Sequence, residues 1–329
     1  MHDKKILSLL FLCFLAFSCA GRKIIVESNP DLNVKRFDVD FYKYLNKQTS
    51  EEGLSAQYKP FLDVFGTQVV NVGTPDSTGF YERLNSFFSD TDLMSLYKDQ
   101  QEKFVDFDFV DKELNPALTT LLTEFPNLKQ PNVYVHVSGL NQSVIVTDEV
   151  LSLSADKYLG ADYPFYRNFF YDYQLQNMTP ERIVPDYLLG FMMANFPFEG
   201  AQDVLLDNIL YEGKLRYILS CLLPERKSWE YVAYTKEQYL WCDKNEANIW
   251  KIILENDHLY TSDYMRITQY TNEAPYTAAV SPQSPGRLGV WVGFRIISSY
   301  MKKHKETTLA DLMKLTDAGE LLKEAKYKP

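Results

Sequence analysis

The sequence has few of the residues that commonly hold metal ions. It contains only four histidines, and no two of them are close enough along the chain to share a helical turn: His2, His136, His258 and His304. Zinc peptidases commonly place two histidines one turn apart with a glutamate beside the first, because the histidines bind the ion and the carboxylate activates its water. We therefore expect no bound metal, no cofactor and no catalytic residues.

Motifs for nucleophilic catalysis and nucleotide binding are also missing. The chain has no Gly-x-Ser-x-Gly turn and no glycine-rich phosphate loop ending in Lys-Ser or Lys-Thr. A glycine-dense stretch runs through Gly286, Gly289 and Gly293, but it follows a Ser-Pro loop and not a strand, so it fails the context test for a dinucleotide site. We expect these glycines to let a helix over residues 287–304 approach a neighbouring helix closely.

Basic charge is in deficit. Lys and Arg number 34 against 44 Asp and Glu, which gives a formal net charge of −10. This charge repels phosphate backbones and anionic lipid headgroups alike, so nucleic-acid binding is disfavoured. Any attachment to a membrane must come from a lipid and not from a basic face.

Long hydrophobic runs are absent as well. The longest apolar stretch near the N-terminus, residues 6–17, is shorter than the roughly 20 residues of a spanning helix. It follows Lys4 and Lys5 and ends at Ser18, directly before Cys19, which is the pattern of a bacterial lipoprotein signal. A plain secretion signal stays open as an alternative, because Phe17 is bulky for its position.

These features predict the organisation of the chain. Residues 1–18 would be a signal peptide, residues 19–34 a tether lipidated at Cys19, and residues 35–329 a single domain facing the periplasm. In an oxidising compartment Cys221 and Cys242 would either form a disulfide or stay as buried thiols, and the sequence leaves both readings open.

The spacing of apolar residues predicts an α+β fold. Helical spacing continues to about residue 126, alternation follows from Val133 to Leu153, and helical spacing then returns. This order indicates a mainly helical protein with a small three- to four-stranded sheet. His136 would be a solvent-facing or hydrogen-bonded sheet residue. The later helices are expected to open at Thr179-Pro180 and to cover residues 202–222, 235–256, 287–304 and 308–325.

Two carboxylates lie on strongly apolar predicted helices. Asp186 and Glu212 must therefore be at the rim of the core or paired with a cation. Glu212 is followed by Gly213 and Lys214, which is the more unusual setting. We favour a paired structural ion there.

Eight segments between residue 36 and the C-terminus share residues with a known family. They are Arg36-Phe37-Asp38, Gly73-Thr74-Pro75-Asp76, Asp156-Lys157-Tyr158-Leu159-Gly160, Val184-Pro185-Asp186-Tyr187-Leu188, Tyr211-Glu212-Gly213-Lys214, Asn245-Glu246 with Trp250, Ser284-Pro285-Gly286-Arg287 with Trp291-Val292-Gly293, and the ending from Asp317 to Pro329. With the lipoprotein-type signal, they resemble the GldB family of gliding-motility-associated lipoproteins.

The resemblance implies a degenerate peptidase-like scaffold. The family looks like a relative of zincin-type metallopeptidases, with the helix over residues 180–195 in the place of their metal-binding helix and Glu212-Gly213 similar to their second-helix Glu-Gly. In this chain Pro185-Asp186-Tyr187-Leu188-Leu189 stands where those enzymes have His-Glu-x-x-His. Both histidine ligands are absent, so Asp186 and Glu212 would mark a vestigial site, and Gly286, Arg287 and Gly293 would be family-motif residues.

The leading functional hypothesis is therefore a non-catalytic, lipid-anchored envelope protein. The resemblance implies contacts with other envelope proteins of a gliding-motility and secretion complex. One alternative is an envelope metallohydrolase that uses Asp186, Glu212 and another carboxylate. Another is a carbohydrate-binding lipoprotein in which the aromatic residues between Tyr163 and Tyr171 stack on sugar rings.

Overall fold

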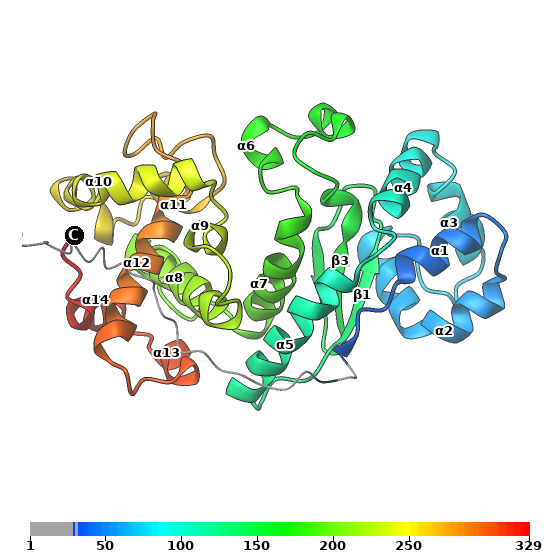
Figure 1. Ribbon diagram of the computed structural model, residues 1–329, viewed down its shortest axis with the longest axis horizontal. Helices are drawn as coiled ribbons and strands as arrows, with labels where there is room; N and C mark the ends of the chain where they lie inside the picture. Colours follow the sequence, from blue (N-terminus) through cyan, green and yellow to red (C-terminus); the bar gives the residue numbers. More distant parts are fainter. Residues whose placement is uncertain (1–28, 30–31) are drawn as a thin grey trace, which may run out of the picture.

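The computed structural model describes residue 29 and residues 32–329 (Figure 1). The predicted signal peptide, the lipidation site at Cys19 and most of the predicted tether lie outside this part of the chain. Within the described part, every helix is too short or too polar to be a candidate for a membrane span.

The first third of the described chain is helical, as the apolar spacing predicts. Its helices are α1 (Phe37–Leu45), α2 (Glu51–Val64) with a π-helical turn (Phe65–Val69), α3 (Phe80–Phe87), α4 (Thr91–Lys103) and α5 (Asp108–Glu124). Helices α1 to α4 form one end of the elongated molecule (Figure 1). Aromatic rings fill the core of this end: the ring of Phe37 lies 4.8 Å from that of Phe61 and 5.0 Å from that of Phe65, in edge-on arrangements.

A three-stranded sheet separates this end from the rest of the molecule. Its strands are β1 (Asn132–His136), β2 (Val144–Val146) and β3 (Val150–Ser154), in the spatial order β1-β3-β2. Strand β3 pairs parallel with β1 and antiparallel with β2. The Tyr187 hydroxyl of α7 (Ile183–Asn195) donates to the Tyr134 carbonyl at 2.5 Å and so ties the sheet to the helices behind it.

The packed body begins earlier than the predicted boundary at residue 35. Leu32 is 1% exposed and Val34 is 9% exposed, and Lys35 forms an isolated bridge to Tyr134 of β1. The Asn29 amide also donates to the Asn115 side chain of α5. At least residues 32–34, which we had placed in the tether, are therefore part of the folded domain.

Helices return after the sheet and make up the other end of the molecule. After a short α6 (Asp172–Leu175) and α7 come α8 (Leu205–Leu222), α9 (Ser228–Tyr231), α10 (Lys236–Glu255), α11 (Tyr264–Thr271), α12 (Leu288–Lys303), α13 (Leu309–Lys314) and α14 (Ala318–Ala325). The predicted mainly helical α+β class is confirmed. Its likeness to the zincin architecture stays a prediction.

Two helix boundaries differ from the prediction, one where an additional cap is present and one where the expected cap is absent. The helix expected over residues 308–325 is two helices, since Thr308 caps α13 by accepting from Asp311 and Asp317 caps α14 by accepting from Glu320. The opening at Thr179-Pro180 is a 3₁₀ turn (Pro180–Arg182), and the Thr179 side chain makes no capping hydrogen bond there.

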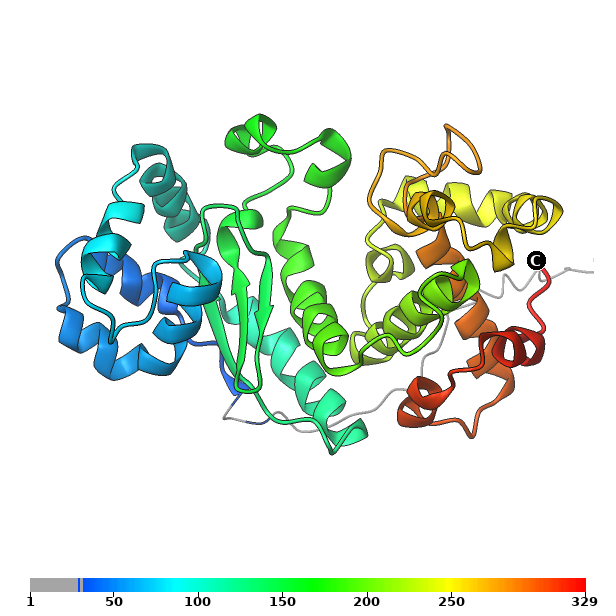
Figure 2. The same cartoon turned by 180° about the vertical axis from the view of Figure 1, so that it is seen from behind.

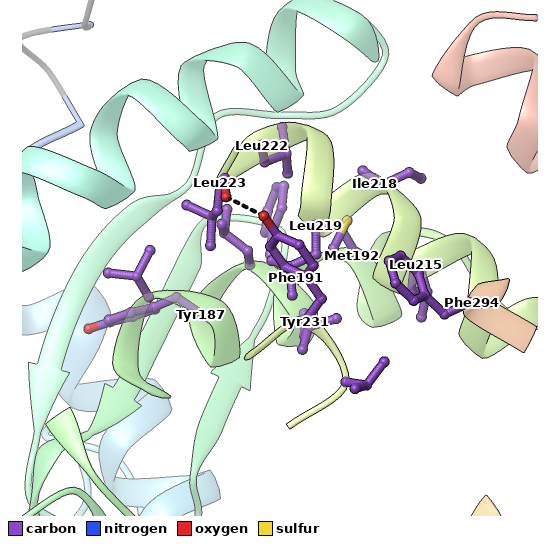
Figure 3. Close-up of a cluster of buried hydrophobic side chains, with 14 of the residues drawn as sticks. Tyr187, Phe191, Met192, Leu215, Ile218, Leu219, Leu222, Leu223, Tyr231 and Phe294 are labelled. Atoms are coloured by element: carbon purple, nitrogen blue, oxygen red, sulfur yellow. Dashed lines mark hydrogen bonds between the residues drawn. The ribbon is translucent and has the colours of Figure 1, made fainter. Parts of the chain in front are cut away.

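The main hydrophobic core lies where α7 and α8 pack together. Figure 3 shows its side chains, among them Phe191 and Met192 from α7, Leu215 and Leu219 from α8, and Tyr231. The Tyr231 hydroxyl donates to the Leu223 carbonyl at 2.9 Å. The six residues predicted to form the apolar face of α7 are all buried: Ile183, Val184, Tyr187, Leu188, Phe191 and Met192.

Candidate functional site

Both predicted site carboxylates are paired with arginines one helical turn away. On α7, the Arg182 guanidinium donates to Asp186 at 2.5 Å, and the Tyr158 hydroxyl donates to the other oxygen of Asp186 at 2.9 Å. On α8, the Arg216 guanidinium donates to Glu212 at 3.0 Å. This pairing confirms the expectation that a carboxylate on such an apolar helix needs a cation or a rim position.

Electrostatics show that the two pairs belong to one group of charges. Burial lowers the pKa of Arg216 to about 10; Glu212 opposes this, the cations Arg287 and Arg182 lower the pKa further, and Asp186 raises it. Burial lowers the pKa of Lys157 as well, and the nearby carboxylates Asp156, Glu273 and Asp186 act against it. We call this group the arginine–carboxylate cluster, consisting of Lys157, Tyr158, Arg182, Asp186, Glu212, Arg216, Glu273 and Arg287.

The guanidinium groups of the cluster keep unused donors. The Nε atoms of the buried Arg182 and Arg216 have no hydrogen-bond partner within the described residues. Guanidinium groups with unused N–H donors attract anions and repel metal cations. The arrangement therefore neutralises Asp186 and Glu212.

The Asp156-to-Gly160 segment brings Lys157 and Tyr158 to α7. The buried Asp156 carboxylate, at the end of β3, accepts from the backbone amides of Ser138 at 3.2 Å and Leu140 at 2.8 Å. The Tyr166 hydroxyl donates to the Asp156 carbonyl at 2.6 Å. These bonds fix the turn after β3 and so place Lys157 and Tyr158.

The Ser284-to-Arg287 segment brings Arg287 to the same group. The Thr277 hydroxyl donates to the Pro285 carbonyl at 2.9 Å and accepts from the Leu288 amide at 3.1 Å. A side chain on Gly286 would collide with the backbone of Ala274. Arg287 itself has a φ of 55°, which is uncommon for a residue other than glycine, and its guanidinium lies 3.5 Å from Glu273. These contacts fix the position of Arg287, whose charge acts on Arg216.

The family-motif residue Gly293 has a packing role. Helices α8 and α12 meet where Gly213 faces Gly293, and a Cβ on either glycine would fall on the backbone of the other helix. At Gly289 a Cβ would come within 2.7 Å of the Ile209 side chain. The expectation that these glycines allow close approach of helix 287–304 to a neighbour is confirmed. The close crossing fixes the distance between Arg216 on α8 and Arg287 at the start of α12.

The histidines lie apart from this cluster. His258 contacts the Tyr270 hydroxyl through Nδ1 at 2.9 Å, and His304 ends α12, as predicted, after Lys302 and Lys303. Among residues 29 and 32–329, no group of three or more His, Cys, Asp or Glu side chains is arranged to hold a metal ion. Cys221 and Cys242 are both buried and are not joined to each other by a disulfide.

His136 differs from the solvent-facing reading of the sequence. It is fully buried, its Nδ1 lies 2.7 Å from the Ser152 hydroxyl, and its Nε2 has no hydrogen-bond partner within the described residues. The rings of Phe61 and Phe65 lie near it. Burial lowers the pKa of His136 to about 3. His136 is buried because α2 and its π-helical turn cover this face of β1. The alternation of apolar residues along the strand does not reveal such a cover.

This burial makes stability sensitive to acid. The unfolded chain binds a proton on His136 below pH 6.5 while the native protein stays neutral there, so stability falls as the pH drops from about 6.5 towards 3. At pH 5 this contributes a loss of about 2 kcal/mol. Urea unfolding at pH 7 and pH 5 measures it. The decrease in the free energy of unfolding between pH 7 and pH 5 should be about 2 kcal/mol smaller in His136→Leu than in the wild type. In the control His304→Gln it should be as large as in the wild type. Equal losses in wild type and His136→Leu would refute the assignment.

The residues that sequence reasoning missed are the cations. Lys157, Arg182 and Arg216 were not singled out, although the available signal was present: Arg182 precedes Asp186, and Arg216 follows Glu212, by four residues each. Of the predicted residues, Asp186, Glu212 and Arg287 come together, while Gly286 and Gly293 position them. The lipidation site at Cys19 lies outside the described residues.

The comparisons with known proteins give one match. The family model described as gliding motility protein GldB matches residues 21–329. No curated protein and no solved structure matches the chain.

Proposed function

Because the chain belongs to the GldB family of gliding motility lipoproteins, we propose that it acts as a non-catalytic, lipid-anchored envelope protein. Its anchor is the lipid on Cys19, its domain faces the periplasm, and it works by contact with other envelope proteins of the motility and secretion machinery. The observation that carries the proposal is the pairing of Asp186 with Arg182 and of Glu212 with Arg216. A carboxylate that accepts from a guanidinium already has part of its acceptor capacity in use, which favours a structural role for Asp186 and Glu212 over binding of a hydrolytic metal.

The segment that carries α6 supplies a candidate surface for such contact. Figures 1 and 2 show it projecting from the body above α7. Phe169 is 61% exposed and Tyr171 is 71% exposed, whereas Tyr166 is buried. Exposed aromatic side chains are typical anchors of protein interfaces. Tyr166 turns inward and the Phe165 and Phe169 rings are inclined by 52°, whereas the Tyr171 and Tyr173 rings are nearly parallel, at 8°.

This surface gives a direct test in native membranes. The full chain with its anchor is purified under mild conditions, and the co-purifying envelope proteins are quantified by mass spectrometry. We expect at least one protein to be depleted about tenfold in Phe169→Ser/Tyr171→Ser, because truncating interface aromatics costs roughly 2 kcal/mol or more.

The matched control for this experiment is Tyr264→Ser, which removes a ring that is 79% exposed on α11. It should recover the same proteins as the wild type. Equal recovery of every protein with Phe169→Ser/Tyr171→Ser, or no specific partner at all, would contradict the proposed contact.

A further inference from the structure

A cavity at the other side of α8 belongs to none of the groups described above. It has a volume of about 650 Å³ and lies among the turn after α5, the segment after α7, α8, and α13 with the turn that follows it. In Figure 1 these elements meet at the lower edge of the molecule. The walls are mainly apolar and include Phe125, Leu128, Phe196, Leu210, Met313 and Leu321. Its size and lining are those of a small-molecule site.

Several polar side chains of the wall are already satisfied within the protein. The Tyr211 hydroxyl donates to the Phe196 carbonyl at 2.8 Å, and the Asn195 amide donates to the Phe191 carbonyl at 2.9 Å. The Asp207 carboxylate accepts from the Ala201 amide at 3.1 Å. These bonds use part of the hydrogen-bonding capacity of the wall.

Lys214 is the wall residue with a buried charge and unused hydrogen-bond donors. It is 8% exposed, and its ammonium donates to the Leu315 carbonyl, which leaves donors unused. Within the described residues no carboxylate lies at ion-pair distance from it; Glu199 and Asp207 act on its charge only from further away. A buried ammonium without a counter-ion is costly, so an anion placed beside it is stabilised.

We propose that this cavity binds a long-chain fatty carboxylate. The carboxylate sits on the Lys214 ammonium, and the acyl chain lies along the apolar wall formed by Phe125, Phe196 and Leu210. The buried Lys214 ammonium suits the charged end of such a ligand, and the apolar part of the wall suits its featureless tail; the wall carboxylates Glu199 and Asp207 form no ion pair with Lys214. This site is separate from the arginine–carboxylate cluster and goes beyond the contact function proposed above.

The test compares a charged and a neutral ligand of equal chain length. The full mature chain carrying Cys19→Ser is used, so that no lipid anchor or detergent competes for the site. Calorimetric titration with palmitate should show saturable binding at one site, and hexadecanol should bind at least about tenfold more weakly, because it lacks the charge-assisted hydrogen bond.

Two lysine variants distinguish the effect of the buried Lys214 charge on binding from the effect of an exposed charge on the cavity wall. Lys214→Met, similar in length but neutral, should weaken palmitate binding at least about tenfold. Lys314→Met removes a wall lysine whose side chain is 75% exposed and should change nothing. Equal binding of palmitate and hexadecanol would indicate a neutral apolar occupant and overturn the proposal. Unchanged affinity in Lys214→Met, or no saturable palmitate binding by the folded wild type, would overturn it too.

Discussion

Replacing Gly293 with alanine is expected to lower the free energy of unfolding by about 3 kcal/mol or more. The added methyl group would overlap the Ile209 carbonyl of α8. A backbone group cannot relieve the overlap by changing rotamer, as a side chain can. Helices α8 and α12 would have to separate, and the buried residues on both would lose contact. Urea unfolding followed by circular dichroism measures the change.

The matched control is Gly319→Ala on α14. There a Cβ would meet only the Asp317 carboxylate at 3.5 Å, which is an ordinary contact. We expect stability to stay the same or to rise by about 0.5–1 kcal/mol, because alanine is the better helix former. If Gly293→Ala unfolded at the same urea concentration as the wild type, the close crossing of α8 and α12 would be wrong.

Replacing Glu212 with glutamine is expected to destabilise the protein by about 3 kcal/mol. The change leaves the Arg216 guanidinium, whose side chain is 5% exposed, without its carboxylate and beside two further arginines, Arg182 and Arg287. The double variant Glu212→Gln/Arg216→Met removes both charges and should recover most of the loss, because a neutral pair needs no counter-ion.

An exposed ion pair of the same spacing provides the control. Lys251 and Glu255 on α10 are 65% and 63% exposed, so Glu255→Gln should change stability by less than about 0.5 kcal/mol. A double variant no more stable than Glu212→Gln alone would show that Glu212 supports the fold in some other way than by neutralising Arg216.

The elements that could be predicted from the sequence are those with a strong local signal. The ranges expected for α8, α10 and α12 agree with the structure to within three residues at each end, because α10 and α12 keep an apolar periodicity over several turns and α8 is a long segment rich in apolar residues and without proline. The prediction of a close helix contact is confirmed at Gly289 and Gly293, because a glycine within a helix pattern needs a packing reason; Gly286 lies before α12 and faces the Ala274 backbone instead.

The candidate site could be predicted only in part, because its parts come from distant segments. Asp186 and Glu212 were recognisable as carboxylates on apolar helices, but an arginine beside them looks like a solvated helix residue until its burial is known. Lys157 and Arg287 come from turns whose positions depend on Asp156 and Thr277. His136 shows the same limit, since only the tertiary packing of α2 and its π-helical turn buries it.

We propose that the arginine–carboxylate cluster supports a scaffold and performs no hydrolysis. The most direct test measures bound zinc by elemental analysis, and peptide cleavage, on the purified full chain and on Glu212→Gln/Arg216→Met, which keeps the fold. We predict far less than one zinc per chain and no cleavage that differs between the two proteins. One zinc per chain, with cleavage that disappears in the folded double variant, would contradict the account.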